Sequence, residues 1–230
     1  MNPRPEQDAM TGRCAPKLVL ASRSPRRRAM LTGAGLTHRA VTPEIDDGEL
    51  SPGSVEAASW VEALSFLKAR SVAESLARDA ALEPGEIVLG ADTVCVVEGR
   101  VIGQPADRDE AGAMIRAFMG REHEVLTGVT LLEPTTGERS IFVDRARVRL
   151  GSLGAGAIES YLESEDWRGK AGAYNFAERL DAGWPLECDG DPATVVGLPM
   201  RRLGGAIEAF CAALGGRSGG LGGACRGRCA

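Results

Sequence analysis

Residues 17–28 read KLVLASRSPRRR, and this stretch holds the first strand and the first helix that the sequence predicts. The apolar run 17–21 is typical of a short buried strand. It is followed by Ser24, a residue type that caps helices, and by Pro25, which fits the first helical turn because its missing N–H has no partner there. We therefore expect a strand, a turn, and then a helix at about 25–33.

Strands and helices continue to alternate beyond this start. Apolar runs bounded by turn residues predict strands at 37–41, 87–97, 100–103, 123–133 and 140–150. Helical spacing predicts helices at 54–79, 107–118, 155–164 and 201–213. Interleaved elements of both kinds predict an α/β or mixed α+β fold around one sheet.

Composition excludes several classes of protein. Of the 230 residues, 43% are hydrophobic and 26% are charged, which is ordinary globular usage. The net charge of −5 argues against a protein that coats nucleic acid, since such proteins carry a basic excess. No run of 18 apolar residues is present, and the start MNPRPEQDAM lacks the core of a signal peptide. We expect a cytoplasmic protein.

The two ends differ from the rest of the chain. Residues 1–15 are polar with early prolines, and residues 215–230 read GGRSGGLGGACRGRCA. Neither segment can bury enough apolar surface to order itself. We expect a disordered N-terminal extension at 1–15, one domain at 16–214, and a flexible Gly/Arg-rich tail at 215–230. The six cysteines form no CxxC pair, so a disulfide framework or a zinc site is not expected.

The first candidate site is the turn from Ser22 to Arg28, in which three consecutive arginines follow the expected cap. A helix N-terminus offers free N–H groups and a positive dipole end, and arginine donates paired hydrogen bonds to phosphate oxygens. Cations are unfavourable at this end of a helix, which points to a bound anion. A solvated basic turn explains the same residues, so both interpretations stay open.

Asp92 and Lys68 are the next candidates. Asp92 interrupts the apolar run 87–97, and a carboxylate in a buried strand has to be paired, hydrogen-bonded or metal-bound. A structural salt bridge to an arginine of the first helix satisfies this requirement as well as a catalytic role does. Lys68 falls in a gap of the apolar row from Trp60 to Leu76, and it can simply extend into water.

Two signals are weaker. Residues 169–174 read GKAGAY, in which small residues let the backbone approach a ligand and Lys170 adds a positive charge. The acidic residues Glu44, Asp46 and Asp47 can hold Mg²⁺ beside a triphosphate, because magnesium combines one or two carboxylates with phosphate oxygens and water. A solvated loop explains these three residues equally well.

Histidines and aromatic residues give little further guidance. His38 and His123 lie far apart in strand-like segments, so a histidine base acting on a serine or cysteine nucleophile has little support. The aromatic residues between Trp167 and Trp184 can stack a nucleotide base, and ordinary packing explains them as well.

Five stretches occur in a fixed order along the chain. They are LVLASRSPRRRAML (18–31), VLGADTVCVVEGRVIGQPADRDEA (88–111), FMGREHEVLTGVTL (118–131), WRGKAGAYNFAE (167–178) and TVVGLPM (194–200). Together they resemble the Maf family from about residue 17 to residue 205, and the first two are the most specific. The resemblance implies an elongated central sheet with two lobes, similar to the inosine triphosphate pyrophosphatases, with the substrate in the cleft between the lobes.

The resemblance also implies an activity. The family hydrolyses nucleoside triphosphates to nucleoside monophosphate and pyrophosphate with a divalent metal, Mg²⁺ or Mn²⁺, usually as a homodimer. It is linked to house-cleaning of modified nucleotides and to cell-division arrest. We therefore expect a nucleoside triphosphate as the substrate, and neither a membrane nor a nucleic acid as a partner.

Matching the family's motif residue by residue gives the expected site. The catalytic position is Asp92, which would also hold the metal together with Asp47. Substrate-binding positions fall on one hydroxyl and four cations, namely Ser22, Arg26, Arg27, Lys68 and Lys170. In this scheme water attacks the α-phosphorus, Asp92 acts as the base or holds the metal, and the cations neutralise phosphate charge.

The chain departs from the family pattern at three positions. Gln104 stands where most relatives carry lysine, Asp47 where glutamate is common, and Ala177 where many have a glutamine that helps to choose the base. Thr93 resembles the branch that acts on thymidine and uridine triphosphates. Arg26, Thr93, Gln104 and Ala177 are thus the expected specificity positions, and we expect a broadened base preference with lower turnover.

Two other functions remain open at this stage. A catalytically weak nucleotide-binding regulator of cell division is favoured by Gln104 and Ala177. A nucleic-acid-binding module could use the SPRRR turn at 24–28, although the acidic net charge and the 4% aromatic content give it poor support.

Overall fold

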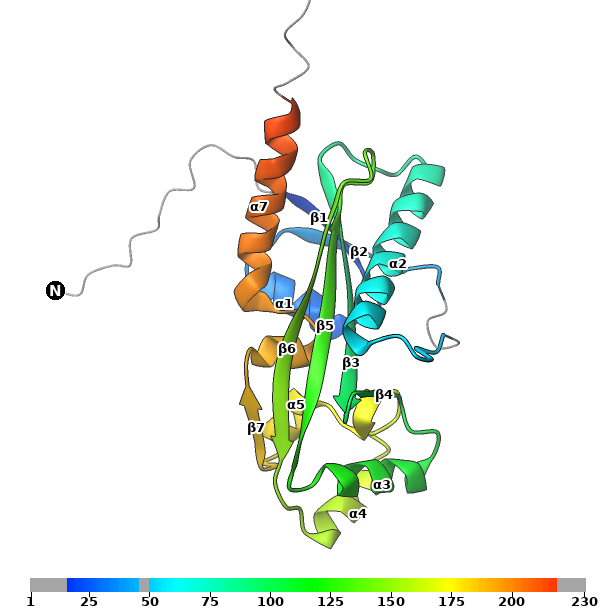
Figure 1. The fold of residues 1–230 in the computed structure, drawn as a ribbon, viewed down its shortest axis with the longest axis vertical. Coiled ribbons are helices and arrows are strands. Elements are labelled where there is room, and N and C mark those ends of the chain that lie inside the picture. The colour runs from blue at the N-terminus through cyan, green and yellow to red at the C-terminus, as the bar shows by residue number, and fades with distance from the viewer. Residues whose placement is uncertain (1–15, 46–49, 219–230) are drawn as a thin grey trace, which may run out of the picture.

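The computed structural model describes residues 16–45 and 50–218 of the chain. These residues form one seven-stranded sheet in the order β2-β1-β3-β5-β6-β7, with β4 paired to β3 (Figure 1). The strands are β1 Lys17–Ala21, β2 His38–Val41, β3 Glu86–Val97, β4 Arg100–Ile102, β5 Arg121–Leu132, β6 Arg139–Leu150 and β7 Leu186–Asp189. The expected N-terminal extension, and the expected tail from residue 219 onward, lie outside the described residues.

The sheet is mixed. β1 pairs in parallel with β2 and β3, whereas the pairs β3–β4, β3–β5, β5–β6 and β6–β7 are antiparallel. β3, β5 and β6 are each 12 residues long and run along the length of the molecule, which gives it an elongated shape (Figure 1). The predicted mixed α/β class is therefore confirmed.

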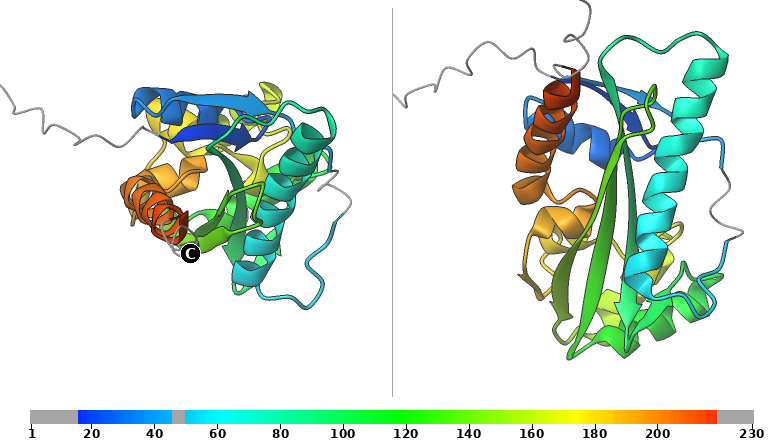
Figure 2. Two further views of the ribbon diagram at one scale, coloured as in Figure 1. Left: turned by 90° about the horizontal axis from the view of Figure 1, so that it is seen from above. Right: turned by 45° about the horizontal axis from the view of Figure 1, so that its top comes forward.

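Helices cover both faces of one end of the sheet, which we call the upper lobe (Figure 2). They are α1 Pro25–Gly33, α2 Ala57–Arg78 and α7 Met200–Ser218. Val19 and Ala21 pack under α2, whereas Leu18 and Leu20 lie in the cluster formed with α1 and α7. Because β1 is buried on both faces, its sequence is a continuous apolar run rather than an alternating one.

Smaller elements cover the other end of the long strands, which we call the lower lobe. They are α3 Arg108–Phe118, α4 Ala155–Glu163, the 3-10 turn η1 Ala171–Ala173 and α5 Phe176–Asp181, while α6 Pro192–Val196 lies between the lobes. Their apolar side chains form one core around the fully buried Trp167, which also includes Trp184. These two tryptophans therefore serve packing rather than base stacking.

The sequence predicted the long helices and strands correctly but missed several short ones. The apolar row expected from Trp60 to Leu76 is confirmed by the burial of Val61, Leu64, Val72 and Leu76, whereas Leu67 within the same span is exposed. The sequence did not predict β7, α5 or α6, which are four to six residues long.

The last helix is longer than expected. α7 continues past the predicted end at 213 to Ser218, so residues 215–218, expected as part of the tail, are helical. Leu214 packs against the core four residues after Phe210 and extends the apolar stripe of the helix by one turn. Within the described ranges, none of the helices combines the length and apolar character needed to cross a bilayer.

Candidate functional site

The turn after β1 and the middle of β3 lie next to each other. In the parallel register Ala21 pairs with Gly90, so β1 ends just before Asp92 and leaves that part of β3 beside the turn from Ser22. Ligands of open α/β sheets bind at such carboxyl ends of parallel strands. The fold thus brings together the two candidates that the sequence ranked first.

The predicted helix cap is confirmed. The Ser24 side chain accepts a hydrogen bond from the Arg27 backbone N–H (3.4 Å), Pro25 occupies the first helical turn, and the Ser22 hydroxyl accepts from the Ser24 N–H (3.1 Å). The first turn of α1 presents its N-terminal end, with Arg26 and Arg27, to the cavity between the lobes.

The Arg27 guanidinium group is held in place by hydrogen bonds to three other residues of the protein. Its Nε donates to the Gly197 carbonyl oxygen (2.9 Å), one terminal nitrogen donates to Thr93 Oγ1 (3.0 Å), and the other to Ser22 Oγ (3.4 Å). The residue is only 9% exposed. Gly197 has φ of 128°, and a Cβ there would lie 3.0 Å from the Arg27 Nε, so this position requires glycine. Arg27 links the turn from Ser22 to the residue after Asp92.

A row of threonines continues this link across the sheet. Thr93 Oγ1 lies 2.8 Å from Thr127 Oγ1, and the Thr127 hydroxyl donates to the Thr194 carbonyl oxygen (2.7 Å). The Thr194 hydroxyl in turn donates to Asp144 (2.6 Å). Since Thr127 and Thr194 are fully buried, these bonds fasten α6 to the sheet and fix the position of Thr93.

Asp92 forms an ion pair with Lys68, which α2 carries to the opposite face of β3 from Thr93. Asp92 is 7% exposed, so its charge needs this partner. The alternative we considered, a salt bridge between Asp92 and an arginine of the first helix, is therefore wrong. The arginine contact falls on the neighbouring Thr93 instead.

Two glycines explain how Lys68 reaches Asp92. A Cβ on Gly90 would lie 2.2 Å from the Ser65 carbonyl oxygen, and one on Gly128 would lie 2.4 Å from that of Val61. Gly128 pairs with Asp92 across the sheet. The backbone of α2 therefore lies directly on β3 and β5, at a distance that no other residue type permits.

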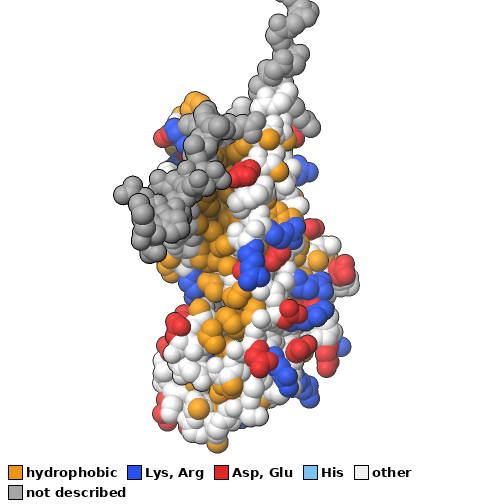
Figure 3. Space-filling model, turned by 90° about the vertical axis from the view of Figure 1, so that its left-hand side faces the viewer, with side chains coloured by type: hydrophobic (Ala, Val, Ile, Leu, Met, Phe, Trp, Pro, Cys, Tyr) orange, Lys and Arg blue, Asp and Glu red, His pale blue; other side chains and the backbone are white. Residues whose placement is uncertain are grey.

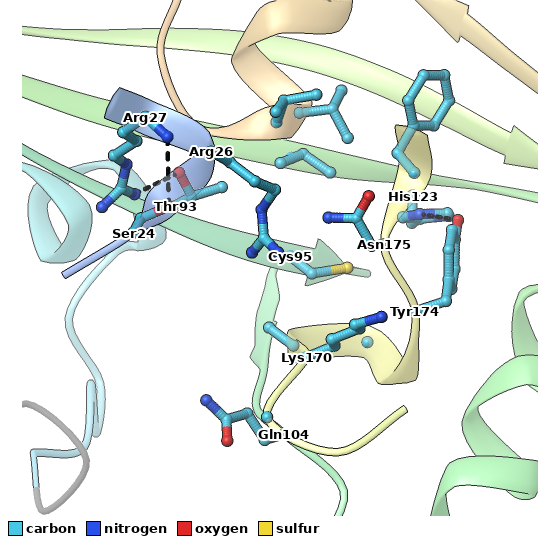
Figure 4. Close-up of a pocket in the computed structure, with 17 residues that line it drawn as sticks. Ser24, Arg26, Arg27, Thr93, Cys95, Gln104, His123, Lys170, Tyr174 and Asn175 are labelled. Atoms are coloured by element: carbon cyan, nitrogen blue, oxygen red, sulfur yellow. Dashed lines mark hydrogen bonds between the residues drawn. The ribbon is translucent and has the colours of Figure 1, made fainter. Parts of the chain in front are cut away.

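A cavity of about 370 Å³ opens between the lobes. The cations on its walls come from both lobes: Arg26 from α1 and Lys170 from the segment before η1 (Figure 4). Thr93 and Gln104 also line the cavity. The structure thus brings together most of the predicted substrate and specificity residues in one polar hollow.

A second, smaller cavity of about 190 Å³ lies on the α2 side and is lined by Ser22 and Lys68. It shares Ser24 and Arg27 with the first cavity, so the two meet at the first turn of α1. Lys68 and Lys170 therefore flank the turn from different hollows.

Glu178 belongs to the site but was not predicted. Its carboxylate forms an ion pair with Lys170, and its Oε1 lies 3.7 Å from the Arg26 guanidinium. Asn175 caps α5 by accepting from the Glu178 backbone N–H (3.0 Å). The sequence signal was available, because Asn175 and Glu178 have the spacing of a helix N-cap with an acidic residue in the first turn.

The inner wall of the cavity is aromatic and uncharged. His123 stacks on Phe118, and its Nε2 lies 3.0 Å from the Tyr174 hydroxyl. Burial lowers the pKa of His123 to about 4, so the ring is neutral at pH 7. Burial also raises the pKa of the Cys95 thiol to about 12, which makes it a poor nucleophile. This wall suits the packing of a nucleotide base.

Other predicted positions lie elsewhere. Ala177 lines an apolar groove between α1, α5 and α6. Glu44 forms an ion pair with Arg78, which lowers the pKa of its carboxyl. Asp46 and Asp47 lie outside the described residues. Among the residues that are described, no three histidine, cysteine or acidic side chains gather as a metal cluster.

Comparison with known proteins shows the family of the chain. A family profile described as Maf-like protein matches residues 17–210. A dTTP/UTP pyrophosphatase of Pelotomaculum thermopropionicum is 40% identical over 194 residues, covering 84% of this chain and 96% of the relative. Proteins of the same name from Symbiobacterium thermophilum (40% over 186 residues, 81% and 90% covered) and Chlorobaculum parvum (38% over 193 residues, 84% and 93% covered) are also similar.

Proposed function

The chain belongs to the Maf-like protein family and is a nucleoside triphosphate pyrophosphatase, and we propose that its preferred substrates are dTTP and UTP. Relatives that share 40% of their residues with it carry that name. Thr93, the residue whose type suggested this branch, lies in the polar cavity.

One observation carries the assignment of the site. The hydrogen bond from Arg27 to Thr93 joins the N-terminal turn of α1 to the strand that holds Asp92. Ser22 of that turn and Lys68, which pairs with Asp92, line the same cavity, so a triphosphate that extends from the turn into this cavity lies near the carboxylate. Binding and hydrolysis then share one site, because the two cavities meet at the turn and Lys68, the ion-pair partner of Asp92, lines the second of them.

Each residue has a task in the proposed reaction. Water adds to the α-phosphorus, Asp92 accepts the proton from that water, and the bond from the α-phosphorus to the bridging oxygen breaks. Arg26 binds the phosphates, while Lys68 and Lys170 neutralise the charge that develops on the leaving pyrophosphate. Arg27 positions the turn rather than moving with the substrate, because its three donor groups are bonded to the protein.

A divalent metal, Mg²⁺ or Mn²⁺, fits this arrangement. Magnesium is held by one or two carboxylates together with phosphate oxygens and water, so Asp92 and the triphosphate itself would supply the donors. Asp47 is the proposed second carboxylate. When bound, the metal neutralises phosphate charge and makes a coordinated water more acidic.

The test is a substrate panel with the purified chain. dTTP, UTP, CTP, ATP and GTP are incubated with Mg²⁺ or Mn²⁺, and both pyrophosphate and the nucleoside product are measured. We expect monophosphate and pyrophosphate in equal amounts, fastest from dTTP and UTP. Release of inorganic phosphate and a diphosphate would refute the reaction, and nucleotide binding without hydrolysis would favour the regulator.

We also propose that the protein is a homodimer. The apolar groove that includes Met30, Leu180 and Met200 lies on the face with a band of hydrophobic side chains in Figure 3, and such a band is typical of an interface. Sedimentation should give twice the mass of the chain, and a Leu180→Glu variant should sediment as a monomer. A wild-type monomer at micromolar concentration would contradict the proposal.

A further inference from the structure

Glu178 is the one carboxylate that touches two cations of the cavity in the part of the chain that the structure describes. It forms an ion pair with Lys170 and approaches Arg26 to 3.7 Å. The Lys170 side chain is 15% exposed and that of Glu178 is 41% exposed. The carboxylate thus lies at the open side of the cluster, where its side chain can turn toward solvent.

The backbone of Glu178 is fixed while its side chain has alternatives. Asn175 holds the Glu178 N–H in the first turn of α5, so the Cα stays beside the cavity. The carboxylate itself is held by the two cations. Ion pairs at this level of exposure are weak compared with buried ones, so a stronger anion can replace them.

Phosphate and carboxylate compete for the same donors. Guanidinium and ammonium groups bind the oxygens of either anion, and phosphate offers more charge. Arg26 and Lys170 come from different lobes, and one carboxylate contacts both. A phosphate group bound by both cations would occupy the same position. In the structure, therefore, Glu178 takes up the donors that a phosphate needs.

We propose that Glu178 is an internal competitor for the phosphate-binding cations, which the triphosphate displaces when it binds. This inference rests on the proposed function for its substrate, because the displacing ligand is a phosphate chain. It assigns Glu178 a role in setting affinity: the ion pairs keep the cations balanced in the free enzyme and weaken the binding of both substrate and pyrophosphate.

A purely structural role makes the opposite prediction. If Glu178 served to hold Arg26 and Lys170 in the correct position, removal of its charge would disorder them and weaken phosphate binding. If it competes, removal frees both cations and strengthens binding. The sign of the change in affinity therefore separates the two roles.

The experiment measures the dissociation constant of inorganic pyrophosphate by calorimetry, with Mg²⁺, for the wild type and for Glu178→Gln. A carboxylate that occupies the cations for about 70 to 90% of the time predicts a constant about three- to tenfold lower in the variant. The KM for dTTP should fall by a similar factor, and kcat should not rise, because substrate and transition state gain equally.

Asp181→Asn is the matched control. Asp181 lies one turn further along α5, is exposed, borders the apolar groove, and gives the same change in net charge. Its pyrophosphate affinity should equal that of the wild type. An equal gain in both variants would show a general charge effect and overturn the proposal.

Unchanged or weaker pyrophosphate binding by Glu178→Gln would also overturn it. Thermal unfolding of both variants confirms that each is folded, which the exposure of Glu178 favours. Pyrophosphate binding requires no hydrolysis, so the competition is measured even if the chain releases no pyrophosphate from any nucleotide. A failure to release pyrophosphate from any nucleotide would count against the proposed function and not against the competition.

Discussion

Two groups of polar and charged residues make up the candidate site, and the protein holds them in different ways. The floor consists of Ser22, Arg27, Lys68, Asp92 and Thr93, which are buried or nearly so and bonded to the fold. The rim consists of Arg26, Gln104, Lys170 and Glu178, and ion pairs join Glu178 to Arg26 and to Lys170. In the proposed reaction, the fixed side chains of the floor hold the reacting atoms, and the more exposed charges of the rim capture the ligand.

Arg26 and Arg27 show the contrast between neighbours. The Arg26 side chain is 45% exposed and its ion pair with Glu178 is long. Arg27 is nearly buried and donates to Gly197, Thr93 and Ser22. One step along α1 turns a side chain by about 100°, which is enough to move it from the rim to the floor.

The largest expected effect is a loss of stability in acid, and it arises at His123, in the cavity wall behind the rim. The pKa of His123 is lowered to about 4 by burial, from an ordinary value of 6.5, so the unfolded chain binds a proton in this range and the folded one does not. Above pH 6.5 the neutral ring costs no free energy of unfolding. As the pH falls from 6.5 to 4, protonation of the unfolded chain lowers the free energy of unfolding. The expected loss is on the order of 3 kcal/mol.

Denaturant unfolding at several pH values measures this loss, with His123→Asn as the control. The variant has no group that titrates at this position, so its stability should change less between pH 6.5 and pH 4. Identical pH profiles for both proteins would show that the wall behind the rim tolerates a charged ring.

The close packing of α2 can be broken at Gly128. A Gly128→Ala change places a Cβ 2.4 Å from the Val61 carbonyl oxygen and forces α2 away from the sheet. We expect a loss of about 1–3 kcal/mol in unfolding free energy, and a fall in kcat because Lys68 moves from Asp92. Gly156→Ala, where nothing lies within 4 Å, should be neutral in both measurements. A stable, fully active Gly128→Ala would contradict this account of the floor.

The two arginines should respond differently to lysine. Arg27→Lys leaves the Gly197 carbonyl and the Thr93 hydroxyl without their donor, and should cost about 1–2 kcal/mol of stability together with lower kcat. Arg26→Lys should leave the melting temperature unchanged and raise only KM. Calorimetric melting and steady-state kinetics distinguish them, and equal melting temperatures for both variants would remove the distinction between floor and rim.

The smallest effect is expected at Gln104. Gln104→Lys adds a cation to the rim, and an exposed ion pair with a phosphate should lower the KM for dTTP by about two- to fivefold. The change should weaken as salt is added, because exposed charges are screened. A KM that does not change at low salt would show that the phosphates bind away from this residue.

The sequence was sufficient where local signals decide the structure. Ser24 and Pro25 predicted the start of α1, and the structure has both in those positions. The apolar runs predicted the three long strands to within two residues at each end. Caps, prolines and strand periodicity are properties of neighbouring residues, so no tertiary information is needed to detect them.

The sequence was insufficient where distant contacts decide. Gly90 and Gly128 matter because α2 packs on them, and neither is unusual within its own strand. Glu178 contacts Arg26, which lies far from it in the sequence. The neighbouring Ala177 was predicted as a specificity position only because of the family resemblance. One of the two interpretations left open for Asp92 placed its partner on α1, but the partner lies on α2, because strand alternation places Asp92 and Thr93 on opposite faces.

The central claim is that the floor performs the chemistry while the rim binds the substrate. The most direct measurement compares pyrophosphate release from dTTP by the wild type and by Asp92→Asn, together with nucleotide affinity. Asparagine keeps the shape of the side chain but cannot accept the proton, so we expect at least about a 100-fold loss in kcat with nucleotide still bound. Equal rates of pyrophosphate release from the two proteins would contradict the claim.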